Sequence, residues 1–156
     1  MAPRSRRPAR APRPAPPAVG ASSPCPCDPA ATYAACCGRF HAGTGVPATA
    51  ELLMRSRYSA FAVRDEAYLL RTWAAGTRPD RLGLDPATRW NGLTILDTKD
   101  GSAFHTTGSV TFLARYTDRA NDPDGGAPGV LRERSTFARE DGRWVYVDGA
   151  LQGAED

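Results

Sequence analysis

The chain has 156 residues and a formal net charge of +3, which suits one small domain with attachments. Residues 1–19 contain five Arg and six Pro but no acidic residue, so this tail carries +5 and residues 20–156 carry −2. The folded part is therefore slightly acidic, and its net charge does not indicate a nucleic-acid-binding face.

The N-terminal segment 1–23 is predicted to be a disordered tail, because a composition dominated by Arg, Pro and Ala buries too little apolar surface to offset the entropy of ordering. Arg6 and Arg7 begin no export signal, since no apolar run of about 7–15 residues follows them. No stretch of about 18 apolar residues is present to span a membrane. We expect a soluble, cytoplasmic protein without a membrane partner.

All four cysteines of the chain lie within thirteen residues: Cys25, Cys27, Cys36 and Cys37. Thiolates are soft ligands that suit zinc, and two close pairs can fill the four corners of a tetrahedral structural site. Disulfides would require an oxidising compartment, and a bond between the adjacent Cys36 and Cys37 would be severely strained. The spacing therefore predicts a knuckle over residues 24–43 that Zn²⁺ holds together. His41 would be a fifth ligand, and we expect it to cap a turn or support a thiolate instead.

Two helices and a run of strands are predicted after the knuckle. The first helix begins near Thr49, a suitable N-cap, and the second runs from Glu66 to about Trp73 after an Asp65 cap. Period-two patterns predict strands over 90–96, 108–116, 132–139 and 143–148, with a long turn at 118–129 and a tight Asp141-Gly142 hairpin. This order predicts an α+β fold over residues 44–150, a curved antiparallel sheet wrapped round two helices as a cone, with 151–156 as a C-terminal tail.

The motifs together resemble a known family. The pattern Cys25-x-Cys27-x8-Cys36-Cys37 looks like the SEC-C metal-binding motif at the C-terminus of the SecA translocation ATPase. Joined to 53–61 (LMRSRYSAF), 72–73 (TW), 90–93 (WNGL), 133–137 (ERSTF) and 141–149 (DGRWVYVDG), it resembles the YchJ family of uncharacterised bacterial proteins. The resemblance implies a zinc knuckle on a cone of the nuclear-transport-factor-2-like (NTF2-like) kind, and no established reaction. Asp28-Pro29-Ala30 stands where the family usually has Gly-Ser-Gly, and Ala74 and Arg132 stand where members often carry His.

Seven residues are candidates to line a pocket in the cone: Arg57, Tyr58, Trp73, Trp90, Tyr116, Glu133 and Ser135. Glu133 and Ser135 share one face of a predicted strand, where burial would raise the pKa of the carboxyl. The interpretation we favour is a structural ion pair between Arg57 and Glu133 with the aromatic side chains as core. The alternative is an open pocket walled by these aromatic side chains.

Three functions remain open on the sequence. The favoured one is a non-enzymatic adaptor whose zinc knuckle docks a protein partner, as the resemblance to the SecA tail implies. The second is a cone pocket that binds or turns over a small molecule, an argument from fold-level analogy. The third is a weak, salt-sensitive contact to nucleic acid through the knuckle and the Arg-rich tail. No Ser-His-Asp order, phosphate loop or His-rich metal site is visible, so no catalytic residue is assigned.

Overall fold

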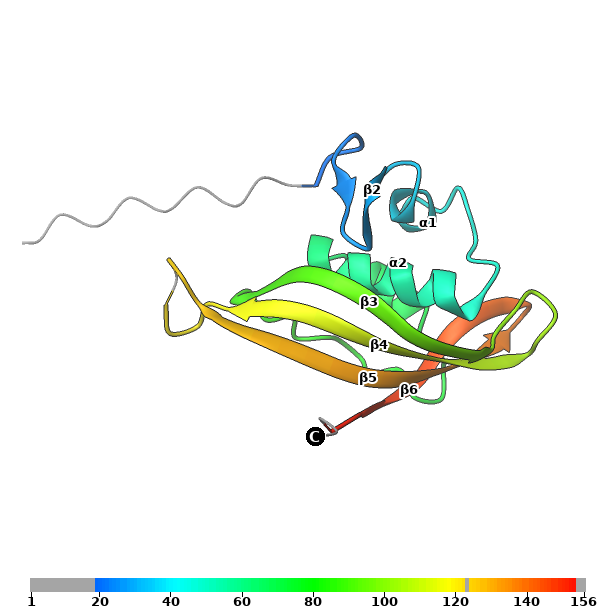
Figure 1. Cartoon of the computed structure of the whole chain (residues 1–156). Helices are drawn as coiled ribbons and strands as arrows, with labels where there is room; N and C mark the ends of the chain where they lie inside the picture. The colour runs from blue at the N-terminus through cyan, green and yellow to red at the C-terminus, as the bar shows by residue number, and fades with distance from the viewer. Residues whose placement is uncertain (1–18, 123, 154–156) are drawn as a thin grey trace, which may run out of the picture.

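A computed structural model describes residues 19–122 and 124–153, so residues 1–18 of the predicted tail lie outside the described part. Its elements in chain order are β1 (Pro24–Cys25), β2 (Asp28–Thr32), α1 (Cys37–His41), α2 (Ala50–Val63), α3 (Glu66–Arg71), β3 (Thr88–Asp100), β4 (Thr107–Asp118), β5 (Ala127–Glu140) and β6 (Arg143–Leu151). They form three layers, in which α2 lies between the knuckle of β1, β2 and α1 and the curved sheet of β3 to β6 (Figure 1). The predicted α+β class is confirmed.

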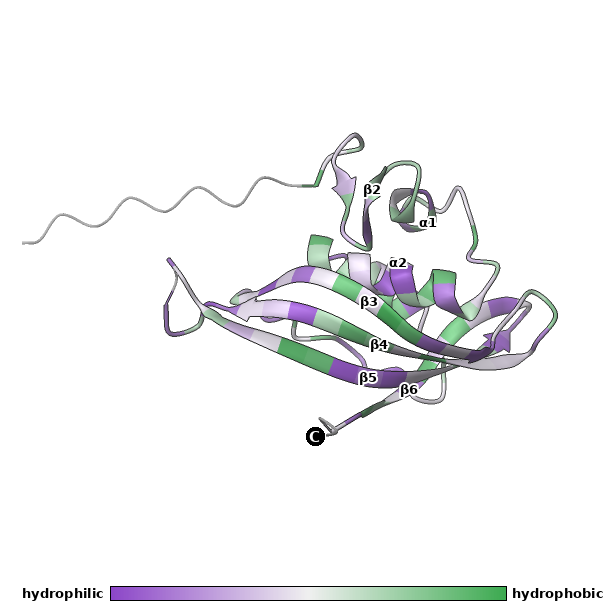
Figure 2. Cartoon of the chain, viewed as in Figure 1, coloured by the Kyte–Doolittle hydropathy of each residue, from purple (hydrophilic) through white to green (hydrophobic). Residues whose placement is uncertain are grey.

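The sheet is an antiparallel meander in the order β3-β4-β5-β6. Every strand extends beyond its predicted bounds, and β5 begins at Ala127, inside the segment predicted as a long turn. Hydrophobic and polar residues alternate only along the part of each strand that covers the core (Figure 2). The polar ends of the strands nevertheless pair with the neighbouring strands. Bulges between Trp90 and Gly92, between Ile95 and Asp97, and between Thr136 and Phe137 help the sheet to curve.

Both predicted helix caps are confirmed. The Thr49 side chain accepts a hydrogen bond from Leu52 N at 3.1 Å, and Asp65 accepts one from Tyr68 N at 3.0 Å. The second helix, α3, ends at Arg71 rather than near Trp73, because the next residues pair with β6. Ala74 N donates to Tyr146 O at 2.7 Å, and Tyr146 N donates to Thr72 O at 2.8 Å.

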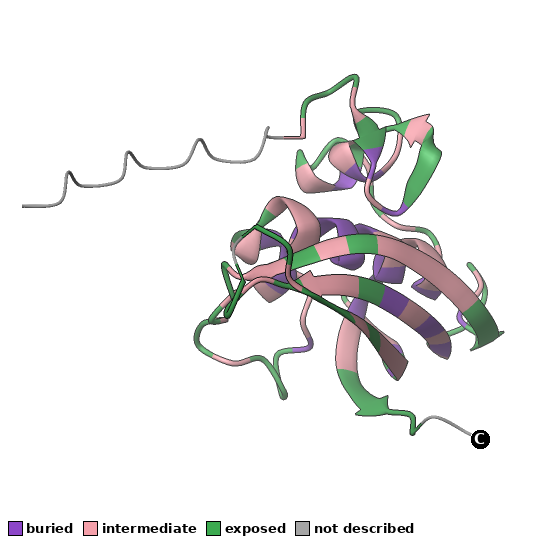
Figure 3. Cartoon of the chain, turned by 60° about the vertical axis from the view of Figure 1, so that its left-hand side comes forward, coloured by how far each residue is buried: buried purple, intermediate pink, exposed green. Residues whose placement is uncertain are grey.

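The Asp141-Gly142 hairpin is confirmed as well. Both residues have positive φ, 51° and 78°, as a type I′ turn requires. On the helical side, α2 is buried along most of its circumference, because the knuckle covers one side and the sheet the other (Figure 3). Within the described residues, no helix combines the length and apolar character needed to cross a bilayer.

Candidate metal centre and adjoining cavity

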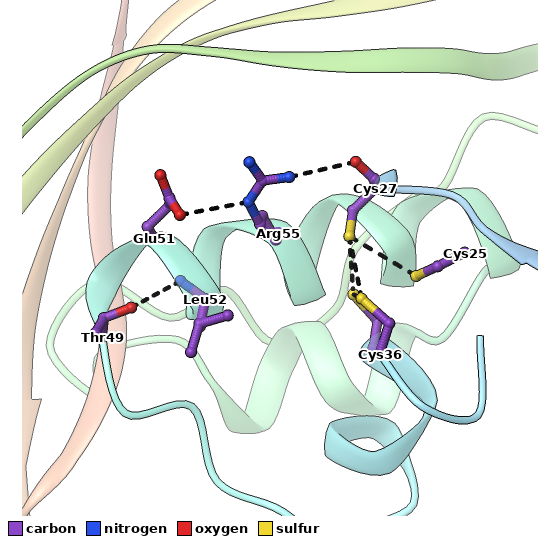
Figure 4. A network of polar contacts seen from close by, with 8 residues as sticks. Cys25, Cys27, Cys36, Thr49, Glu51, Leu52 and Arg55 are labelled. Carbon is purple, nitrogen blue, oxygen red and sulfur yellow. Dashed lines mark hydrogen bonds and ion pairs between the residues drawn. The ribbon is translucent and has the colours of Figure 1, made fainter. Parts of the chain in front are cut away.

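The four cysteine sulfurs converge on one point (Figure 4). Cys27 Sγ lies 3.7 Å from Cys25 Sγ and 3.5 Å from both Cys36 Sγ and Cys37 Sγ, and the last two sulfurs are 3.9 Å apart. Four sulfurs at about 2.3 Å from a tetrahedral metal would be about 3.8 Å from one another. All four lie within 4.8 Å of one another, so the cluster has the donors and the spacing to hold a metal ion.

The local chain explains why the sulfurs meet. The short β1–β2 hairpin carries the first pair, and Cys36 and Cys37 stand at the start of α1. Gly38 N donates to Tyr33 O at 2.8 Å, and a Cβ on Gly38 would lie only 2.6 Å from that oxygen, so this turn requires glycine. At 28–30, where the family's usual glycines are missing, none of the residues has positive φ, and Asp28 Oδ1 accepts from Ala30 N at 3.0 Å.

Burial and mutual contact make the thiols electrostatically interdependent. Contacts with Cys27 and then Cys37 lower the pKa of Cys25. Contact with Cys25 raises the pKa of Cys27 to about 12 and raises that of Cys37. One thiolate therefore forms readily, and its negative charge opposes the formation of the others. A divalent cation between the sulfurs would remove that opposition.

The knuckle is fastened to α2 by a chain of hydrogen bonds through His41, which is not part of the sulfur cluster. His41 Nε2 donates to Ser56 O at 2.8 Å, because a carbonyl can only accept. The other ring nitrogen, Nδ1, forms a hydrogen bond with the Tyr33 hydroxyl at 2.5 Å. Arg71 Nη2 also donates to His41 O at 2.8 Å. His41 thus joins the knuckle to α2 from outside the cluster, and its ring contacts Tyr33 and Ser56 rather than the thiolate or turn that was expected from the sequence.

Two further contacts join the cluster itself to α2. The Ser59 hydroxyl lies 3.7 Å from Cys25 Sγ. Arg55 Nη1 donates to Cys27 O at 3.4 Å, as Figure 4 shows. Arg55 is also held by Glu51, with Nε 3.5 Å from Oε2. Helix α2 therefore supplies two polar side chains to the knuckle, Arg55 and Ser59, a role that its amphipathic pattern did not reveal.

A cavity of about 330 Å³ opens on the other side of α2, between the helix and the sheet. Six of the seven predicted pocket residues line it, and Tyr116 does not; its ring packs against Trp90, with the centroids 5.6 Å apart. The lining residues that sequence reasoning missed are Met54, Phe61, Phe112, Ala114, Leu131, Phe137 and Tyr146. The period-two pattern places several of these on the inner faces of strands, but only the curvature of the sheet leaves space between them and α2.

The predicted ion pair between Arg57 and Glu133 is wrong: within the described residues their charged groups do not approach within 4.0 Å. Arg57 Nη1 instead donates to Leu69 O and to Thr72 Oγ1, both at 2.7 Å. The guanidinium carbon lies 4.5 Å from the centre of the Tyr146 ring and 5.1 Å from that of Trp73. One backbone carbonyl, one hydroxyl and two ring faces contact the guanidinium in place of a carboxylate, and sequence patterns do not reveal such partners.

Burial shifts the pKa values of the cavity's polar groups. It lowers the pKa of Arg57 to about 10 and raises that of Tyr146 to about 12. It also raises the pKa of Glu133, against the smaller opposing effects of the Tyr146 hydroxyl and Arg57. A Cβ on Gly149 would overlap Glu133 Oε1 and would lie 2.9 Å from the Tyr146 hydroxyl, so the missing side chain makes room for both groups.

Comparisons with known proteins agree with this architecture. A family model described as "YchJ, middle NTF2-like domain" matches residues 49–149. The chain belongs to the YchJ family. A UPF0225 protein of Streptomyces coelicolor is 60% identical over 126 residues, covering 81% of this chain and 94% of that protein. A UPF0225 protein of Cupriavidus metallidurans is 47% identical, covering 83% and 90%. The predicted NTF2-like cone is thereby confirmed.

Two solved structures are similar over most of the chain. A SEC-C motif containing protein from Rhodopseudomonas palustris has a TM-score of 0.66 at 31% identity, covering 78% of this chain and 93% of its own. A SEC-C motif containing protein from Psychrobacter arcticus has a TM-score of 0.62 at 26% identity, covering 86% and 85%. Both are described as SEC-C motif proteins, which is the motif that the four-cysteine spacing of this chain resembles.

Proposed function

We propose that this protein binds Zn²⁺ in its four-cysteine knuckle and uses the knuckle to dock a protein partner. The observation that supports the metal most directly is the set of sulfur–sulfur distances, which match tetrahedral thiolate coordination. Cys25, Cys27 and Cys37 are at most 5% exposed, so a metal with four thiolates would have no open position for water. Closed sites of this kind are structural rather than catalytic.

The outer surface of the knuckle supports the docking role. Asp28, Pro29, Ala30 and Thr32 of β2 are exposed, as are Ala34 and Ala35 after it. These side chains are short and mostly uncharged, so a partner can approach the backbone closely and little side-chain entropy is lost. The likeness of the knuckle to the SecA tail points to the same role. The nucleic-acid alternative depends on a tail that lies mostly outside the described residues, and it stays a prediction.

The metal is tested first, by native mass spectrometry of chain purified without chelator. We expect one zinc per chain and its loss in a Cys36→Ser/Cys37→Ser variant. A chain lighter by two hydrogens per cysteine pair would mean disulfides and would overturn the site.

The docking role requires a variant that keeps the metal. Ala30→Glu/Thr32→Glu places two charges on the exposed face of β2 while leaving all four thiols intact. A partner crosslinked to residues 28–35 in cells, then purified, should bind the natural chain and lose at least tenfold in affinity for this variant. Val130→Glu, at a 61% exposed position on β5, is the matched control. Equal binding to all three chains would exclude the knuckle as the docking surface.

A further inference from the structure

The cavity beside α2 contains a cation without a carboxylate partner. Arg57 is 5% exposed and lines the cavity, yet among the described residues its hydrogen bonds use Nη1 only. Nε and Nη2 form the edge of a guanidinium that matches a carboxylate with two parallel hydrogen bonds. A buried charge without such a partner is costly, so this edge favours an anion that enters from outside.

A second hydrogen-bonding group faces the same space. Ser135 is 3% exposed and lines the cavity, and its hydroxyl has no hydrogen-bond partner among the described residues. Glu133 lies beyond it on β5, held beside Tyr146 above Gly149. Because burial raises the pKa of Glu133, this carboxyl opposes an incoming anion less than an exposed glutamate would.

The rest of the wall is apolar and largely aromatic. Phe61, Trp73, Trp90, Phe112, Phe137 and Tyr146 surround the space. A volume of about 330 Å³ is at the small end of ligand pockets, which run from about 300 to 1,000 Å³. One water occupies about 30 Å³ of liquid, so the cavity accommodates on the order of ten non-hydrogen atoms. Flat rings pack well against such walls.

We infer that this cavity binds a small planar monocarboxylate, with its ring among the aromatic side chains and its carboxylate on the Nε–Nη2 edge of Arg57. The Ser135 hydroxyl donates to the same head group. A cationic ligand is disfavoured by Arg57, and a neutral ligand of the same shape leaves the guanidinium edge unpaired.

The experiment uses the full zinc-loaded chain, with trans-cinnamate and trans-cinnamamide as the probes. Trp73 and Trp90 line the cavity, whereas Trp144 donates its indole N–H to Ala48 O at 3.1 Å and does not line it. Titration followed by the three indole N–H signals in NMR should therefore move the first two and leave the third. We expect cinnamate to bind at least tenfold more tightly than the amide.

Three other outcomes would each contradict a different part of the inference: the carboxylate, the location of the site, or binding itself. Equal or tighter binding of the amide would leave a pocket but exclude the carboxylate. Movement of Trp144 alone would mean a different site. No change at any of the three signals with 10 mM of either probe would exclude binding of this class altogether.

Two variants separate the roles of the charged side chains. Arg57→Gln should abolish the preference for cinnamate over the amide, with the Trp144 signal as the check that the chain is folded. If the Arg57→Gln chain is too unstable to study, Glu133→Gln provides a second test of the inference. It removes the competing carboxyl and should bind cinnamate at least as tightly as the natural chain. A tenfold loss with Glu133→Gln would mean that the probe binds as the protonated acid, which donates to Glu133, contrary to the inference.

Discussion

Removal of zinc should destabilise the cone as well as the knuckle. A helix as short as α1 is not stable alone, so without the proposed metal on Cys36 and Cys37 the segment 37–41 should unfold. Phe40 is 5% exposed and packs against Ala60, Tyr68 and Leu69, and its burial is worth about 2 kcal/mol. The two side-chain hydrogen bonds of His41 add about 1 kcal/mol each. The cone should therefore lose about 4 kcal/mol of unfolding free energy, a large part of the 5–15 kcal/mol typical of a domain.

This loss is measurable as a shift in melting temperature. For a chain of 156 residues about 4 kcal/mol corresponds to a fall of roughly 8–16 °C. The assay is thermal unfolding followed through Trp144, which is 3% exposed and lies in the cone rather than in the knuckle. Chelated chain and a Cys37→Ser variant should both show the shift, and returning zinc should reverse it in the natural chain only. A fall of less than about 3 °C after complete zinc release would refute the reasoning, because the knuckle would then contribute nothing to the cone.

Three smaller predictions test single contacts. Ser59→Ala removes the hydroxyl beside Cys25 and should weaken zinc binding by about tenfold in chelator competition, and unchanged affinity would exclude a role for that contact. Tyr33→Phe should lower the unfolding free energy by about 1 kcal/mol in urea denaturation, and no loss would mean that water replaces the hydroxyl. Glu133→Gln should raise stability at pH 7–8 relative to the natural chain. The raised pKa of Glu133 means that the folded chain holds its proton more tightly, so its stability falls as pH rises from the unfolded pKa towards the folded one. The advantage of the variant should disappear below about pH 4, and an advantage independent of pH would contradict this cause.

The sequence was sufficient wherever a local rule determines the outcome. Caps at Thr49 and Asp65 and the Asp141-Gly142 turn follow from backbone hydrogen bonding and positive φ within a few residues. The cysteine spacing likewise predicts a cluster, because all four ligands belong to one short segment. Strand ends were underestimated, since the polar ends of a long ribbon pair without leaving a hydrophobic pattern.

These local rules do not identify the partners of a side chain that are distant from it in the sequence. The expected carboxylate for Arg57 follows from the cost of a buried charge, but the structure meets that cost in part with Leu69 O, Thr72 Oγ1 and two ring faces. A carbonyl is available at every residue, so its use as a partner leaves no mark in the sequence. The cavity was equally hidden, because its volume depends on how far bulges curve the sheet away from α2.

The position of α2 between the knuckle and the sheet explains why residues 53–61 include both small polar and large side chains. The Ser59 hydroxyl lies beside Cys25 on the side that meets the knuckle, where the Ser56 carbonyl also accepts from His41. The Ser56 hydroxyl itself contacts the Tyr68 hydroxyl of α3 at 2.6 Å. Arg57, Tyr58 and Phe61 line the cavity on the other side. A single amphipathic stripe would bury one face of a surface helix, whereas α2 has two buried faces of different chemistry. The four-cysteine cluster and the cavity therefore share one wall, and a shift of α2 at the cluster would also move the guanidinium of Arg57.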